Sequence, residues 1–306
     1  MTPPHLPVLL EPVLELLSPQ PGMRIVDATV GGGGHAEAIA RRLGGAGKLI
    51  AIDRDPEMLE CAGKRLAPYG SSVRLVHARI SHLREVLAGA ELDAVDAILF
   101  DLGLCSLQLD DPVRGFRFQP AGRPVPLDMR MDRTWGRTAA ELLEEIDEAE
   151  LAGLLREGGV PRPRAVARAL RSRLPIGDAG ELVEAVSTVA LPQRSHHPAT
   201  LVFQALRIAV NDEYRELELG VEAAVELLRP GGRLAVLSYH SGEDRRIKEI
   251  FAREARGCIC PPGLPVCGCG RTPRLRLLAR GKGPPPEEVL RNPRARSARL
   301  RGGERK

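Results

Sequence analysis

The sequence predicts an α/β fold, in which a doubly wound parallel sheet is interrupted by a helical insertion. Continuously apolar strands alternate with helical patterns over the first hundred residues, helical patterns without strands follow, and the strand pattern then returns. Strands buried on both faces of a parallel sheet are continuously apolar in this way. Alternation of strand and helix is typical of doubly wound sheets.

Four stretches in the first part have the composition of buried strands, being rich in β-branched residues or leucine. They are RIVDATV (24–30), KLIAIDRD (48–55), VRLVHARI (73–80) and AVDAILFDLG (94–103). Between them, AEAIARRLG (36–44) and PEMLECAGKRLA (56–67) have helical spacing. Gly44 and Gly45 end the first of these helices.

The pattern changes after Gln108, where a loop-like stretch rich in Pro, Gly and charge begins. Three stretches with amphipathic helical patterns follow it, at 139–159, 165–174 and 179–191. A long helical stretch (199–228) then leads to the strand GGRLAVLSYHS (231–241), which restores the sheet pattern. We therefore predict a sheet domain whose first part is 1–108, an inserted helical domain at 109–199, and a second part at 200–306 with a basic C-terminal tail. The insertion has the size of a small domain.

The composition is that of a globular protein, with 43% hydrophobic and 27% charged residues. No run of about 18 apolar residues is present, which argues against a transmembrane helix. The stretch MTPPHLPVLLEPVLELL lacks a basic region and contains Glu11 and Glu15, so it does not resemble a signal peptide. We expect a cytoplasmic protein with no membrane partner.

The net charge of +4 is unevenly distributed. From Arg253 to Lys306, 14 Lys and Arg residues stand against 4 Asp and Glu, whereas the other 252 residues include 30 basic and 36 acidic ones. A basic end suggests a nucleic-acid partner, because Lys and Arg gain free energy by releasing counterions from phosphates. A solvated arm without a fixed partner is the alternative.

The motif DATVGGGGH, which begins at Asp27, places four glycines between a predicted strand and a predicted helix. Such a turn exposes backbone N–H groups at the carboxyl edge of a sheet. Asp53 ends the next strand, in the register where an acid binds ribose hydroxyls. The pattern indicates a nucleoside-containing cofactor of one of two classes. Gly31, Gly33 and Ala36 match the dinucleotide spacing, whereas an acid in the position of Asp27 is typical of S-adenosylmethionine enzymes.

The predicted fourth strand ends in FDLGLCSLQLDD, and its carboxyl end lies beside the first strand in a doubly wound sheet. Asp101 is located there, where amino-methyltransferases place an acid or polar residue against the target amine. An NAD-dependent dehydrogenase would instead need a proton-transfer group. His196 and His197 are candidates, although adjacent histidines point in different directions.

Nine motifs, spread over nearly the whole chain, match those of a known family. They are HLPVLLEPVLELL, DATVGGGGH, AIDRDP, DLGLCSLQLDD, RGFRF, PLDMRMD, HPATLVFQALRIAVN, SYHSGEDR and NPRARSA. Together they resemble the bacterial 16S rRNA (cytosine-N4)-methyltransferases, the ribosomal RNA small subunit methyltransferase H or MraW family. Several of the motifs are long and specific, so chance is a poor explanation for the resemblance.

The resemblance implies a Rossmann-like sheet of the S-adenosylmethionine-dependent methyltransferases, with an inserted helical domain that helps to recognise RNA. The cofactor-binding residues that it implies are Gly33, Gly34, His35, Asp53, Ile80, Asp101 and Gln108. The implied substrate is a cytosine, expected to be cytosine-1402, in the decoding region of 16S rRNA within the small ribosomal subunit. A homodimer is compatible with the sequence, which does not determine the oligomeric state.

Several positions depart from the family pattern. Ile80 replaces a Phe beside the adenine, where it gives apolar contact without stacking. The usual Val-Ser-Ser-Pro is Leu-Cys-Ser-Leu at 104–107, the usual Leu of His-Ser-Leu-Glu-Asp is Gly242, and the usual Arg after His-Pro-Ala-Thr is Leu201. No obvious reactive group is removed, so these changes bear on the shape of the pocket and on RNA contact.

Asp101 is the candidate catalytic residue. A carboxylate hydrogen-bonded to the cytosine amine would stabilise the positive charge that develops on the attacking nitrogen, and the target base must leave its stack to reach it. Alternatively, Asp101 only holds the cofactor. Cys105 could act as a nucleophile if methylation occurred at cytosine carbon 5. Methylation of nitrogen needs no such nucleophile, so we favour a pocket-wall role for Cys105.

Six polar residues are candidates for substrate contact, namely Asp128, Arg130, Asp132, Asn211, His240 and Arg245. Structural alternatives stand beside these roles. The PLDMRMD charges could form an internal salt-bridge cluster, Asn211 could join the two domains, and His240 could belong to the cap of a helix that opens with acids.

Cysteines cluster in the segment CICPPGLPVCGCG. Four thiols are candidate zinc ligands, at Cys258, Cys260, Cys267 and Cys269. The Cys-x-Cys spacing is shorter than the usual Cys-x2-Cys, and a disulfide is disfavoured in a reducing cytoplasm. We predict no metal site, with these four cysteines as the one zinc candidate. A non-catalytic RNA-binding assembly factor is the other alternative, and the acids at 27, 53 and 101 argue against it.

Overall fold

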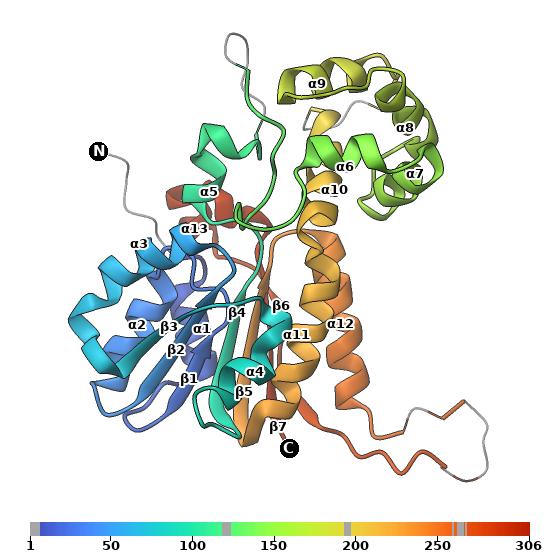
Figure 1. Cartoon of the computed structure of the whole chain (residues 1–306). Coiled ribbons are helices and arrows are strands. Elements are labelled where there is room, and N and C mark those ends of the chain that lie inside the picture. Colours follow the sequence, from blue (N-terminus) through green and yellow to red (C-terminus); the bar gives the residue numbers. More distant parts are fainter. Residues whose placement is uncertain (1–6, 118–123, 193–196, 259, 262–265, 267) are drawn as a thin grey trace. The chain divides into compact units, whose positions relative to one another are not determined.

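The computed structural model describes residues 7–117, 124–192, 197–258, 260–261, 266 and 268–306 (Figure 1). It contains two compact units, of which the first comprises Met1–Gly103 with Tyr214–Lys306 and the second comprises Leu104–Glu213. The second unit is longer at both ends than the predicted insertion. Part of the reason is the helix α10 (Ala199–Asn211), which buries Val202, Phe203 and Leu206 in the core of the second unit.

The first unit is built on a seven-stranded sheet with the order β3-β2-β1-β4-β5-β7-β6 (Figure 1). The strands are β1 (Arg24–Asp27), β2 (Lys48–Asp53), β3 (Val73–His77), β4 (Val95–Asp101), β5 (Leu228–Ser238), β6 (Leu275–Lys282) and β7 (Arg299–Arg305). The first five are parallel, whereas β7 is antiparallel to both β5 and β6. This topology confirms the predicted Rossmann-like α/β fold, and its order reverses between β1 and β4.

Side chains of the central strands alternate between two apolar layers, as the period of a strand requires. On β4, Ala97 and Leu99 join the layer that contains α1 (Leu10–Leu17), α2 (Gly34–Leu43) and α3 (Pro56–Leu66). Ile98 and Phe100 join the opposite layer, with α4 (Leu83–Ala88), α11 (Glu213–Leu227) and α12 (Ser241–Ala255). Burial on both faces explains why the strand sequences are continuously apolar. Short 3-10 segments at Ala67–Ser72 and Ile80–His82 flank β3.

The segment predicted as a basic tail contains two strands, β6 and β7, with α13 (Pro286–Arg291) and a 3-10 turn (Pro293–Ser297) between them. Its sequence conceals β7, because the buried positions include Gly302 and Gly303 rather than large apolar residues. A Cβ atom on Gly302 would lie 2.3 Å from Leu16 Cδ2, so any larger residue there would have to displace the Leu16 side chain of α1. Arg301 of β7 makes a bidentate ion pair with Asp244 of α12, with both distances 2.8 Å.

The second unit consists of helices around a core of its own. They are α5 (Ser106–Asp110), a 3-10 turn (Pro112–Arg114), α6 (Ala139–Glu145), α7 (Glu148–Glu157), α8 (Pro163–Arg171), α9 (Ala179–Ser187) and α10. The predicted helical stretch 139–159 is two helices, because Asp147 caps α7 by accepting from the N–H of Glu150. The long stretch 199–228 is also divided, at Asp212, whose φ is 51°.

Within the described part of the chain, no helix is both long enough and apolar enough to cross a lipid bilayer.

Candidate active site

The glycine run forms a tight turn between β1 and α2. Gly31 and Gly33 have positive φ values of 49° and 80°, and Gly33 is the N-cap of α2. Positive φ is strained for other residues, which explains glycine at these two positions. The Gly31 N–H donates to Asp53 Oδ2 at 2.8 Å. The turn therefore packs its bare backbone against the acid at the end of β2.

Asp53 also accepts from the N–H of Asp55, at 2.9 Å. Burial raises the pKa of the Asp53 carboxyl to about 6, although the two N–H donors act in the opposite direction. A carboxylate has about four lone-pair positions, so these two hydrogen bonds leave acceptor capacity for a hydroxyl ligand. The ribose-binding role of Asp53 stays a prediction.

His35, Asp101 and Tyr239 meet at the carboxyl edge of the sheet. Asp101, at the end of β4, lies with Oδ2 3.2 Å from His35 Nδ1. Its Oδ1 accepts from the Tyr239 hydroxyl at 2.6 Å, one residue beyond the end of β5. The structure thus brings together two sequence-predicted site residues, together with a tyrosine for which the sequence suggested no role.

The hydrogen bonds of His35 determine its protonation. His35 Nε2 lies 3.0 Å from the carbonyl oxygen of Val8, which can only accept, and Nδ1 faces the carboxylate of Asp101. Both ring nitrogens act as donors only in the imidazolium form. Burial opposes that charged form, but the hydrogen bond and charge of Asp101 outweigh it and raise the pKa of His35. The geometry therefore fits an ion pair between the buried His35 and the partly exposed Asp101.

Asp27 adds a third carboxyl group at this edge. It is 1% exposed and accepts from the Thr29 N–H at 3.2 Å, while Thr29 Oγ1 accepts from the N–H of Asp101 at 2.6 Å. Burial raises the pKa of Asp27 to about 7, and the charges of Asp101 and Asp53 add to that rise. The site thus holds two further acids, Asp53 and Asp101, against one imidazolium, and Asp27 gains a negative charge most readily beside a cation. A cationic ligand is favoured over a pyrophosphate, since like charges repel strongly at partly buried sites. The site is placed at the switch point of the sheet, where ligands of such folds bind.

The other candidates of the first unit lie on its helices and turns. Ile80 begins the 3-10 turn after β3 and packs on α11, where a Cβ atom on Gly220 would lie 3.1 Å from Ile80 Cγ1. His240 is the N-cap of α12, and its Nδ1 accepts from the Glu243 N–H at 3.4 Å. Arg245, on the same helix, is exposed. Their roles with cofactor or substrate stay predictions.

The remaining candidates lie in the second unit. Gln108 is buried, and its Oε1 accepts from the Cys105 N–H in the cap of α5, at 3.0 Å. Arg130 makes a bidentate ion pair with Asp128, with N–O distances of 2.7 and 2.9 Å. Burial acts to raise the pKa of Asp128, but hydrogen bonds from Arg130 dominate and lower it. Asp132 accepts from the N–H and hydroxyl of Thr134.

Asn211 holds the PLDMRMD loop in place within the second unit. Its Oδ1 accepts from the Met131 N–H at 2.8 Å, and its amide nitrogen donates to the carbonyls of Met129 and Arg207 at 2.7 and 2.8 Å. Met129 has a positive φ of 61°, an uncommon conformation that these bonds support. Arg114 begins the RGFRF motif, but the sequence assigned it no role; it is fully buried and donates to the Met131 carbonyl at 2.9 Å.

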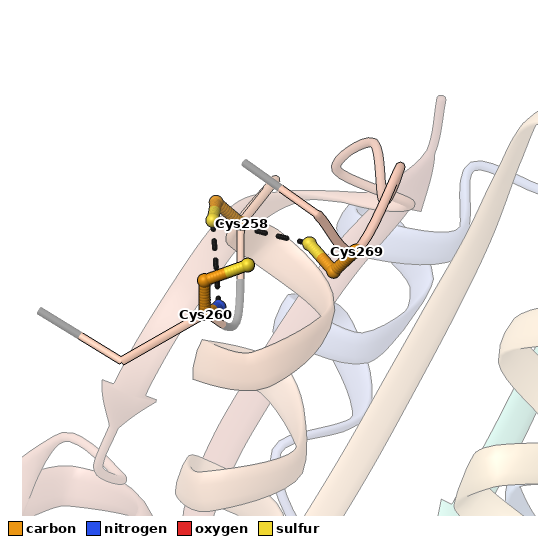
Figure 2. Close-up of side chains that lie close together, drawn as sticks. All are labelled: Cys258, Cys260 and Cys269. Atoms are coloured by element: carbon orange, nitrogen blue, oxygen red, sulfur yellow. Dashed lines mark hydrogen bonds between the residues drawn. The ribbon is translucent and has the colours of Figure 1, made fainter. Parts of the chain in front are cut away.

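Three of the four candidate zinc ligands lie together, namely Cys258, Cys260 and Cys269 (Figure 2). The fourth, Cys267, lies outside the described residues, as does His196.

Comparison with known proteins identifies the family. The model of the MraW methylase family matches residues 2–306. The chain belongs to the MraW methylase family. Similar relatives include proteins named ribosomal RNA small subunit methyltransferase H. That of Thermomicrobium roseum is 49% identical over 98% of this chain and 93% of the relative, and that of Heliobacterium modesticaldum is 45% identical over 98% of each.

Membership of the MraW methylase family decides between the two cofactor classes left open by the glycine motif, in favour of a methyltransferase. Among solved structures, an rRNA methylase from Streptococcus thermophilus covers 97% of this chain and 93% of its own. It is 13% identical with a TM-score of 0.43, which is too remote a likeness to carry an argument about function.

Proposed function

We propose that this protein transfers a methyl group from S-adenosylmethionine to the exocyclic N4 of a cytosine in the decoding region of 16S rRNA, expected to be cytosine-1402. It does so in the cytoplasm, on the small ribosomal subunit. The observation that carries the proposal is the match of the MraW methylase family over nearly the whole chain. The names of the relatives at 45% and 49% identity support small-subunit rRNA as the substrate. A homodimer stays a prediction.

The acids at the carboxyl edge of the sheet support the choice of cofactor. S-adenosylmethionine carries a positively charged sulfonium, which supplies the electrophilic methyl group and suits the carboxyl groups of Asp27 and Asp101. The turn formed by Gly33, Gly34 and His35 lies beside it, and Asp53 accepts from the ribose hydroxyls. Ile80 contacts the adenine, and Gln108 completes the set implied by the family.

Asp101 acts on the reacting amine. The lone pair of N4 is conjugated with the ring, so the nitrogen is a poor nucleophile and gains positive charge as its bond to the methyl carbon forms and the carbon–sulfur bond breaks. A carboxylate that accepts a hydrogen bond from the amine stabilises that charge. His35 and Tyr239 hold the carboxylate from both of its oxygens, which fixes its direction. One proton then leaves N4 for water or a base.

The substrate residues are those predicted from the sequence, apart from Asn211. Asp128, Arg130 and Asp132 belong to the second unit, which we assign to RNA recognition, and the buried Asn211 positions their loop rather than contacting RNA itself. His240 and Arg245 lie at the start of α12. The exposed Arg245 contacts phosphate, with the arginine-rich C-terminal segment.

Methyl transfer to defined RNA tests the proposal. Purified protein is incubated with methyl-labelled S-adenosylmethionine and either unmodified small subunits or naked 16S rRNA, and the labelled nucleoside is identified after digestion. We expect N4-methylcytidine. Label at cytosine carbon 5, or no label on either RNA from a protein that binds S-adenosylhomocysteine, would contradict the proposed reaction.

The role of Asp101 has its own test. We expect Asp101→Ala to lower the rate of transfer by about 100-fold, the loss seen when a group that stabilises transition-state charge is removed. Asp93→Ala, at an exposed position before β4, is the matched control and should leave the rate unchanged. Full activity of Asp101→Ala would remove Asp101 from the mechanism without changing the class of enzyme. Calorimetry with S-adenosylhomocysteine and with NAD should detect binding of the first alone.

A further inference from the structure

Three thiols converge in the segment between α12 and β6. Cys258 and Cys260 follow the end of α12, and Cys269 precedes β6, yet their Sγ atoms all lie within 4.8 Å of one another (Figure 2). Cys258 Sγ and Cys269 Sγ are 3.9 Å apart, and Cys258 Sγ also accepts from the N–H of Cys260 at 3.4 Å. None of the three forms a disulfide.

Hydrogen bonds of Glu254 join the two ends of this segment, where α12 ends and where β6 begins. Glu254, in the last turn of α12, is 1% exposed and accepts from Arg271 on both of its oxygens, at 2.8 Å each. Arg274 adds a bond from Nε at 2.6 Å, and its N–H donates to the Glu254 carbonyl at 2.8 Å. Burial acts to raise the pKa of Glu254, but these guanidinium groups dominate and lower it to about 2. The two ends of the segment are thus held side by side by charged, buried hydrogen bonds.

The spacing of the sulfurs discriminates between two kinds of cross-link. A disulfide needs sulfur atoms about 2.05 Å apart. Tetrahedral thiolates at about 2.3 Å from a zinc ion lie about 3.8 Å from one another. The 3.9 Å between Cys258 Sγ and Cys269 Sγ, which also corresponds to a thiol–thiol hydrogen bond, is too long for a disulfide and close to the spacing of zinc-bound thiolates.

We propose that Cys258, Cys260 and Cys269 bind a structural Zn²⁺ ion as thiolates. Zinc is the common structural metal for sites rich in cysteine, and its fourth position is filled by a further donor or by water. The ion joins the end of α12 to the entry of β6, beside the ion pairs of Glu254, and so stabilises the antiparallel edge of the sheet. This site is independent of the proposed methyl transfer.

Metal analysis of the full-length protein tests the proposal. The protein is grown with added zinc, dialysed against a weak chelator and measured by mass spectrometry of the metal, and the sulfur ligands are counted by X-ray absorption at the zinc edge. We expect about one zinc per chain, with at least three sulfur ligands at about 2.3 Å. Protein without zinc but with reduced thiols, or zinc bound only through nitrogen and oxygen, would overturn the proposal.

Single variants make the test specific. Cys258→Ser, Cys260→Ser and Cys269→Ser should each lose most of the bound zinc, whereas Cys61→Ser, which removes a free thiol from α3, should retain it. Cobalt supplies a second readout, because thiolate ligands give it a charge-transfer absorption band that the same three variants should weaken. A disulfide between Cys258 and Cys269 in protein purified without reductant, with no zinc bound, would overturn the proposal, because the cysteines would then form a covalent cross-link instead of a metal site.

Discussion

Asp27 should make this protein less stable as the pH rises from 5 to 8. Its pKa is 3.8 in an unfolded chain and about 7 in the folded protein, so the folded state holds the proton more strongly. A group whose folded pKa is raised in this way destabilises the fold wherever the unfolded chain has already lost the proton. Each pKa unit corresponds to about 1.4 kcal/mol. The cost is therefore about 2 kcal/mol at pH 5 and about 4 kcal/mol at pH 8.

Asp27→Asn removes the charge and retains the shape. The difference in unfolding free energy between this variant and the wild type should shift in favour of the variant by about 3 kcal/mol between pH 5 and pH 8. Equilibrium urea unfolding at both values measures it, and any pH-independent cost of the amide cancels in the comparison. Asp93→Asn, at an exposed position, should show no such shift. A difference for Asp27→Asn that stays constant, or falls, between pH 5 and pH 8 would refute the assignment of a buried, hard-to-ionise carboxyl.

Three further substitutions test other parts of the structure. Tyr239→Phe removes the hydroxyl that holds Asp101 and should lower kcat about tenfold, with KM for the methyl donor nearly unchanged, since a hydrogen bond to a charged group contributes about 1.5 kcal/mol. Arg114→Met should lower the unfolding free energy by about 3 kcal/mol in urea titrations, because the guanidinium is fully buried, whereas Arg117→Met on the surface should change it by less than about 0.5 kcal/mol. Glu254→Gln leaves guanidinium groups without their buried carboxylate and should cost about 2 kcal/mol by the same measurement.

Much of the first unit was predictable because the residue types along its strands follow directly from where those strands lie in the sheet. Each parallel strand is apolar throughout since both of its faces are covered, and the acids follow directly where the strands end. Asp27, Asp53 and Asp101 could therefore be assigned to one edge before their neighbours were known. The strand β7 was not predicted, because two of its three buried positions are glycines, of which Gly302 faces Leu16 of α1.

Partnerships between distant residues could not be predicted in the same way. Nothing near Tyr239 in the sequence indicates that its hydroxyl bonds Asp101, which precedes it by 138 positions. The charge count of the C-terminal segment was correct, but it did not indicate how many arginines are neutralised within the fold. Arg301 is paired with Asp244, and Arg271 and Arg274 with Glu254. Several of the basic side chains in this segment thus form internal ion pairs. Its net charge therefore overstates the number of positive charges that remain available to contact RNA.

The buried acids that lower stability also prepare the site for its proposed ligand. The Asp27 carboxyl is costly to ionise because it is buried and lies near the charge of Asp101, and His35 supplies only one positive charge beside it. A sulfonium would supply a second, so binding of the methyl donor should favour ionisation of Asp27 and recover part of the cost of burying it. That attraction disappears once the methyl group has been transferred, because the sulfur of the product is neutral. The negative field at this edge of the sheet should therefore bind the methyl donor more tightly than the product, which lacks the positive charge.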